Sequence, residues 1–219
     1  LMALSKLNFN SLNVTPTASK GIGFDSGADD LEASFSGGSM QFIKKLTASS
    51  SATLDFVHGS GGVDFSTHKE YVFIFNNLHP QTDDQIFTFQ GSIDAGSNYN
   101  VAITSTTFFA NHNEADSTAA LGYQSNFDQA QGTAFQQTSG TTGSDNDQCN
   151  VGILHLFNPS STTFVKHFIC RTSIYSATNY AVDANVAGYF NTTSDIDAMQ
   201  FKYQSGNIDA GTICLYGIA

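Results

Sequence analysis

The chain has 219 residues, of which 40% are hydrophobic and only 12% charged, and its 19 acidic and 8 basic residues give a formal net charge of −11. This balance excludes the basic surface that a phosphate-backbone partner needs, so no nucleic-acid role is expected. Nineteen Phe and eight Tyr without a Trp favour a core of aromatic and β-branched residues, which is typical of sheet proteins.

The N-terminal residues 1–46 differ from the rest in being small, polar and rich in turn formers. Such a segment cannot bury enough surface to fold alone. We therefore predict an extended arm over 1–46 that becomes ordered on a larger partner and attaches a domain at 47–219; a flexible tail is the alternative. The expected anchors of the arm are its recurring apolar residues, Leu4, Leu7, Phe9, Leu12 and Val14.

The rest of the chain predicts about ten short strands separated by Gly- and Asn-rich turns, with no sustained helical period. Their ranges are 40–46, 51–57, 69–78, 85–90, 98–110, 151–158, 162–170, 186–192, 197–203 and 212–218. Evenly spaced short strands of this kind predict an all-β fold, an antiparallel β-sandwich or jelly roll.

Two of these strands, 69–78 and 212–218, carry apolar residues on both faces. A strand of this composition is expected to be central and covered on both sides. We expect a second sheet on one face, and the arm or another subunit on the other.

A similar turn sequence occurs twice, at Gly91–Ser97 and at Gly206–Thr212. Each opens on Gly and closes on Asp-Ala-Gly or a close variant, which suits a hairpin of about five residues. The match fits either an old duplication or two independent uses of one favourable hairpin.

A long polar loop is predicted over residues 110–150. Loops of this length inside compact domains usually have a function or form contacts. Tyr123, Phe127 and Phe135 are its aromatic residues. They are interpreted either as plugs into the core or as contacts with a partner.

The sequence lacks the patterns that catalysis needs. Glu is scarce, which disfavours the carboxylate pair of a glycosidase, and the nucleophile elbow, the zincin helix and the phosphate loop are absent. Asp145-Asn146-Asp147 lacks the Gly and the distal Glu of a calcium loop. A cation held jointly with another loop or subunit is the alternative there. No enzymatic activity, cofactor or metal is therefore predicted.

Cys149, Cys170 and Cys214 have no Cys-x-x-Cys spacing, which fits neither a disulfide framework nor a zinc site. Reduced thiols indicate folding in a cytoplasm. The first residues lack the apolar stretch of a signal peptide, and no apolar run is long enough to cross a bilayer. A soluble protein without membrane insertion is expected.

Three stretches in the second half carry a recognisable pattern, Leu154–Thr163, Gly188–Thr193 and Ser205–Gly217. The first contains Leu-His-Leu-Phe-Asn-Pro-Ser-Ser-Thr-Thr. With them, residues 69–219 resemble a family of virion structural proteins of marine tailed phages that infect cyanobacteria and heterotrophic marine bacteria. Its members are called structural, head-decoration or fibre proteins.

The resemblance implies a surface structural protein of the virion, made in the cytoplasm of the host bacterium. Its N-terminal arm would attach it to other capsid or tail proteins, and copies would associate, for example as a trimer. A head position is favoured over a tail fibre, because the sequence has no coiled coil or repetitive shaft. The alternative is a module of a tail fibre that binds host-surface glycans, although without Trp its stacking platform would be weaker.

Overall fold

The computed structural model describes residues 21–24, 31–35 and 39–218. The chain divides into two compact units, Leu1–Gln41 and Phe42–Ala219. In the first unit, β1 (Gly21–Phe24) pairs antiparallel with β2 (Leu31–Phe35). The expected anchors Leu4, Leu7, Phe9, Leu12 and Val14 lie outside the described residues, so the extended arm stays a prediction.

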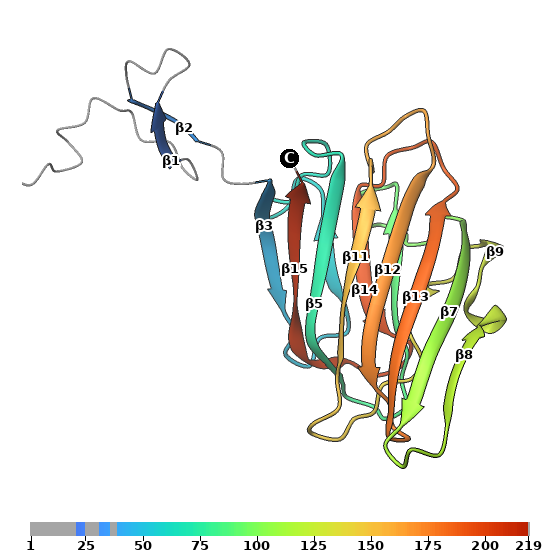
Figure 1. Cartoon of the computed structure of the whole chain (residues 1–219). Helices are drawn as coiled ribbons and strands as arrows, with labels where there is room; N and C mark the ends of the chain where they lie inside the picture. The colour runs from blue at the N-terminus through green and yellow to red at the C-terminus, as the bar shows by residue number, and fades with distance from the viewer. Residues whose placement is uncertain (1–20, 25–30, 36–38, 219) are drawn as a thin grey trace, which may run out of the picture. The chain divides into compact units, whose positions relative to one another are not determined.

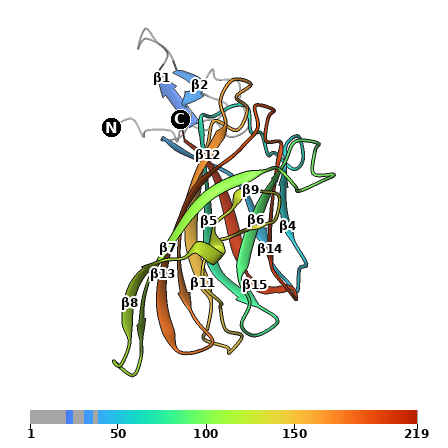
Figure 2. The same ribbon diagram turned by 90° about the vertical axis from the view of Figure 1, so that its right-hand side faces the viewer.

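The rest of the chain forms two sheets packed against each other (Figures 1 and 2). The nine-stranded sheet has the order β3 (Met40–Thr47), β15 (Ile208–Ile218), β5 (Glu70–Pro80), β11 (Asn150–Phe157), β12 (Lys166–Tyr175), β13 (Tyr180–Phe190), β7 (Ile103–Asn113), β8 (Ala119–Tyr123), with β9 (Ala130–Gly132) also on β7. The four-stranded sheet has the order β10 (Gln136–Gln137), β6 (Phe87–Ser92), β14 (Ala198–Tyr203), β4 (Leu54–Val57).

This architecture confirms the predicted all-β sandwich. Every strand pair whose register is described is antiparallel. The finer prediction of a jelly roll is not confirmed, because the sheets hold four and nine strands and β11, β12 and β13 follow one another as a meander. The predicted boundary at residue 46 is wrong: β3 already belongs to the larger sheet, next to β15.

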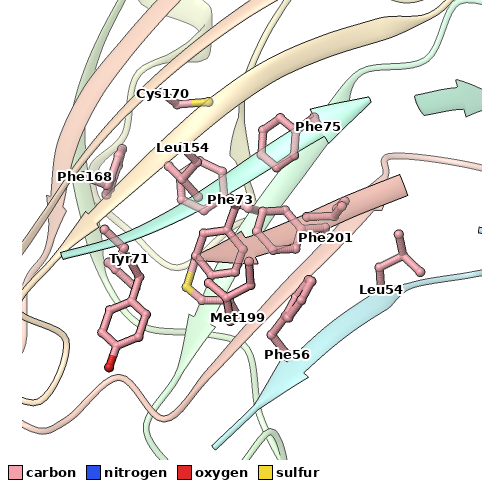
Figure 3. Close-up of a cluster of buried hydrophobic side chains, with 14 of the residues drawn as sticks. Leu54, Phe56, Tyr71, Phe73, Phe75, Leu154, Phe168, Cys170, Met199 and Phe201 are labelled. Carbon is pink, nitrogen blue, oxygen red and sulfur yellow. The ribbon is translucent and has the colours of Figure 1, made fainter. Parts of the chain in front are cut away.

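The core lies between the sheets and is largely aromatic (Figure 3). Phe201 on β14 is its centre, with ring centroids of Phe73 at 5.1 Å and Phe75 at 5.5 Å across the sandwich and that of Phe56 at 6.1 Å on the neighbouring strand β4. Most of these pairs meet edge to face or tilted, which is the arrangement that aromatic rings prefer. Alternation along β5 points Tyr71, Phe73 and Phe75 into this core.

The two doubly apolar strands are central, as predicted. β5 lies between β15 and β11, and β15 lies between β3 and β5. Ile213 and Leu215 of β15 are fully buried, whereas Cys214 and Tyr216 on its other face are half-buried. The cover that was expected on that other face stays a prediction.

The region predicted as a long loop, 110–150, is instead mostly ordered structure. β7 continues to Asn113, and β8, a 3-10 turn (η2, Ser125–Phe127), β9 and β10 follow. β9 pairs with β7 of the larger sheet, while β10 pairs with β6 of the smaller one. The segment therefore joins the two sheets along one side of the sandwich. The polar sequence of the segment predicts a loop, because its strands lack apolar alternation.

Buried side chains fix this segment in place. The Gln90 amide donates to the carbonyl oxygens of Val101, Thr133 and Ala134 at 3.0–3.2 Å. The Thr138 hydroxyl donates to the carbonyl of Phe87 at 2.8 Å, and the Thr172 hydroxyl donates to the carbonyl of Thr138 at 2.8 Å. Because buried polar groups are costly unless they are hydrogen-bonded, these bonds select one position for the segment.

Neither of the two similar turn sequences is a hairpin, which corrects that prediction. Each links a strand of the smaller sheet to one of the larger: β6 to β7, and β14 to β15. The first forms a turn with positive φ at Ala95 and Gly96, whereas the second runs into β15, where Gly211 has φ +109. A Cβ on Gly211 would lie 2.4 Å from the carbonyl oxygen of Asn77. The bulge at this point therefore requires glycine.

Within the described ranges no helix is long and apolar enough to span a membrane; η2, three residues long, is the helical segment of the sandwich.

Truncating Phe201 to Ala should lower the free energy of unfolding by about 3–5 kcal/mol, because it leaves a cavity between the sheets. Urea denaturation measures this loss. Phe164→Ala is the matched control, since its side chain is 68% exposed, and its effect should stay within about 0.5 kcal/mol. Equal effects of the two variants would contradict the assigned centre of the core.

Candidate interaction surface

The outer face is the face of the nine-stranded sheet that points away from the smaller sheet, toward the viewer in Figure 1. Alternation along each strand places its residues: inward positions are buried and outward ones are exposed or half-buried. Several outward side chains are large and apolar. Exposed examples are Phe42 on β3, Phe108 on β7, Leu121 and Tyr123 on β8, Val151 on β11 and Ile169 on β12.

A shallow hollow of about 530 Å³ lies on the outer face. Its floor is Ala187, which stands between Ile169 and Thr106 on the neighbouring strands. Aromatic side chains of Phe157, His167 and Tyr189 line it. The rings of His167 and Tyr189 lie 5.7 Å apart. The small side chain of Ala187 leaves this hollow open, because a larger side chain at this position would fill it.

Charged groups on the outer face are mostly paired. Arg171 donates two hydrogen bonds to Asp183, from Nε at 2.9 Å and Nη2 at 2.7 Å. This bond from Arg171 lowers the pKa of the Asp183 carboxyl and raises that of the guanidinium. His155 Nδ1 lies 2.5 Å from Glu70 Oε1 on the neighbouring strand. The charges of Arg171 and Asp183 cancel, so this part of the outer face is suited to contact with uncharged groups.

At one end of the sandwich, the buried side chain of Lys166 joins the stretch Leu154–Thr163 to the stretch Gly188–Thr193. Lys166 is fully buried and its ammonium donates to the carbonyl of Ser161 at 2.5 Å and to that of Thr192 at 3.1 Å. The main chain adds a bond from Ile196 N to Pro159 O at 3.0 Å. Desolvation lowers the pKa of Lys166, against the opposing charge of Asp195. Its role is to hold two turns together.

The aromatic residues predicted for the long loop occupy three different environments. Tyr123 is 64% exposed and its hydroxyl donates to Asp128. Phe127 packs on Phe109, with ring centroids 4.8 Å apart. Phe135 is half-buried beneath the Lys202 ammonium, which lies 4.2 Å from the ring centroid. The structure does not bring the three together, and their part in partner contacts stays a prediction.

Sequence reasoning missed the residues of the hollow, Phe157, His167, Ala187 and Tyr189. A signal was present, because alternation marks them as outward positions on three neighbouring strands. What could not be seen was the register that aligns them across the sheet.

In the described part of the chain, no group of three or more His, Cys, Asp or Glu side chains is placed to hold a metal ion. Cys149, Cys170 and Cys214 form no disulfide with one another. Burial raises the pKa of the Cys170 thiol far above its ordinary value, which makes it a poor nucleophile.

Comparison of the chain with family models, curated proteins and solved structures found no match.

Replacing Lys166 with Met should lower the free energy of unfolding by about 1–3 kcal/mol, because two carbonyls lose a charged donor. Burial lowers the pKa of Lys166 in the folded chain. At alkaline pH the lysine therefore loses its proton in the folded chain before it does so in the unfolded chain. The stability advantage of the wild type should therefore grow as the pH rises from neutral toward the ordinary lysine value of 10.5.

Urea denaturation of both proteins at several pH values tests this expectation. The exposed Lys45→Met is the control and should change neither the stability nor its pH dependence. A difference between wild type and Lys166→Met that is constant or shrinks with pH would contradict the assignment.

Proposed function

We propose that this chain is a structural protein of a bacteriophage virion, a surface module of the decoration or fibre type. The observation that carries the proposal is the sequence resemblance in Leu154–Thr163, Gly188–Thr193 and Ser205–Gly217. Two of these stretches meet at buried Lys166 through its bonds to Ser161 and Thr192. The residues that carry the resemblance thus include turns that are held in place by a buried side chain, which fits a structural protein.

The chemistry of the sandwich supports a structural role over catalysis. Buried polar side chains such as Gln90 and Thr138 hold main-chain carbonyls, and on the outer face Arg171 and Asp183 neutralise each other. A module of this kind is made in the host cytoplasm, where thiols stay reduced. Residues 1–38 would attach it to the particle, with the head favoured over the tail.

A second candidate function is recognition of host glycans in the hollow around Ala187. Phe157, His167 and Tyr189 offer ring faces, and Thr104 and Thr106 offer hydroxyl groups at its edge. Sugars stack their apolar faces on aromatic rings while hydroxyls bind their polar groups. Without Trp this platform would bind weakly, so a structural role remains the leading proposal.

If the chain is a virion protein, particles of a phage that encodes it should contain it after gradient purification. Gold-labelled antibodies against the sandwich should mark the head in electron micrographs. A variant lacking residues 1–38 keeps β3 and should fold, yet it should no longer bind particles that lack the protein. Binding by the truncated protein would contradict attachment through the arm, whereas absence from purified particles would contradict the virion role.

If the hollow binds glycans, Tyr189→Ala should reduce binding on a glycan array by at least about tenfold, the loss of one stacking contact worth about 1.4 kcal/mol. Phe164→Ala removes an aromatic ring that is exposed outside the hollow and is the control. Absence of binding by the wild type, or equal binding by the two variants, would exclude the hollow as a glycan site.

A further inference from the structure

The free edge of β8 is unlike the other strand edges of the sandwich. In the described part of the chain, β8 is the terminal strand of the larger sheet and pairs only with β7. Four of its five residues are exposed, with Leu121 at 74%. Figure 2 shows the β7–β8 hairpin extending away from the strands of the smaller sheet. Neither face of the tip of this hairpin is therefore covered by the four-stranded sheet.

Hydrogen bonding shows which groups of β8 point to the free edge. Asn113 N donates to Thr118 O at 3.0 Å, and Gln124 N donates to Thr107 O at 2.9 Å. In an antiparallel pair, bonded and non-bonded residues alternate. Ala120 and Gly122 therefore also face β7, whereas the N–H and C=O groups of three residues point outward. These three are Ala119, Leu121 and Tyr123.

The other edges carry the features that discourage pairing between chains. β3 ends the larger sheet on the other side and holds Lys44 and Lys45. In the smaller sheet, β4 contains Asp55 and β10 has only 2 residues. Charged side chains and very short strands are the usual protections of an exposed edge. β8, with 5 residues, is longer than β4 or β10. β8 lacks the charges, because no charged residue occurs from Ser117 to Phe127.

We propose that β8 pairs with β8 of a second copy about a two-fold axis through Leu121. The register that places Leu121 opposite its partner's Leu121 also places Ala119 opposite Tyr123 of the partner subunit. It would form about six hydrogen bonds between the outward N–H and C=O groups. The two nine-stranded sheets would then continue into each other, and this proposal does not rest on the virion role.

Side chains favour a second copy over an unrelated strand. Opposed residues in an antiparallel pair lie on the same face, so Leu121 of each copy is covered by the other. The large ring of Tyr123 lies over the small Ala119, on both sides of the axis. The acidic Asp116 and Asp128 fall outside the paired residues. In a chain of net charge −11, this is a stretch where two copies can approach without like charges in contact.

Because a pair of five-residue strands is smaller than a stable interface of about 1,200–2,000 Å², the association should be weak. Sedimentation velocity of the full chain at concentrations up to about 500 µM should show reversible dimers with a Kd above about 10 µM. Leu121→Lys should weaken dimerisation at least tenfold by placing two ammonium groups side by side. Ile169→Lys, at a position on β12 that is also exposed but lies away from the edge, should leave it unchanged.

A disulfide gives a second, position-specific test. Bonded antiparallel residues lie about 5.5 Å apart between Cα atoms, within the range that a disulfide spans. In a background with Cys149 and Cys214 changed to Ser, Leu121→Cys should form a cross-linked dimer on oxidation, and Ile169→Cys should not. The proposal is overturned if the wild type stays monomeric, if trimers form instead, if Leu121→Lys dimerises like the wild type, or if both cysteine variants cross-link equally.

Discussion

The constraint on which this fold depends is that a four-stranded sheet cannot cover a nine-stranded one. Aromatic side chains of β6 and β14 cover the larger sheet over β5 and β12, where Phe201 meets Phe73 and Phe89 meets Phe168 at 5.1 Å. Beyond them, β13 and β7 would expose their inner face. The segment between β8 and β11 fills that space, with Phe127 adding to a smaller apolar cluster around Phe109. Because this cover lacks a full ladder of its own, its main-chain groups need side-chain partners, and Gln90, Thr138 and Thr172 supply them.

The parts of the fold that the sequence predicts are those that depend on patterns within a single strand. The strands around Phe73, Leu154 and Phe201 were predictable, because strong aromatic and β-branched alternation is local. The first half of β13 was missed, although Val182 and Ala184 alternate inward, because its Asp and Asn residues are depleted in strands. β9 and β10 were missed because their pairing partners lie far away in the sequence. Two similar turn sequences were interpreted as hairpins, since whether the next strand joins the same sheet is decided by packing.

The outer face shows the same limit for the candidate site. Its aromatic residues Phe157, His167 and Tyr189 stand on three strands and meet only because the register of β11, β12 and β13 aligns them. The small Ala187, two residues before Tyr189 on β13, has no local signature at all. Lys166 is a comparable case: a lysine in a strand is usually assigned to solvent, yet here the turns at Ser161 and Thr192 have carbonyls that need a donor. In each case, distant residues decide what a side chain does.

The negative net charge of the chain gives the uncharged edge of β8 its significance. Copies of a protein with a net charge of −11 repel one another in solution. The edges at β3 and β4 carry charged side chains, and the edge at β10 is only 2 residues long. An edge strand of five residues without a charge is therefore an exception among the described strands. Two-fold strand pairing through so few residues would be weak between free molecules. It would become substantial only where copies are held close together, because attachment to a common surface raises their effective concentration to the millimolar range. Weak, reversible strand pairing is thus suited to copies that are already attached to a common surface. It is unsuited to copies that must pair in dilute solution.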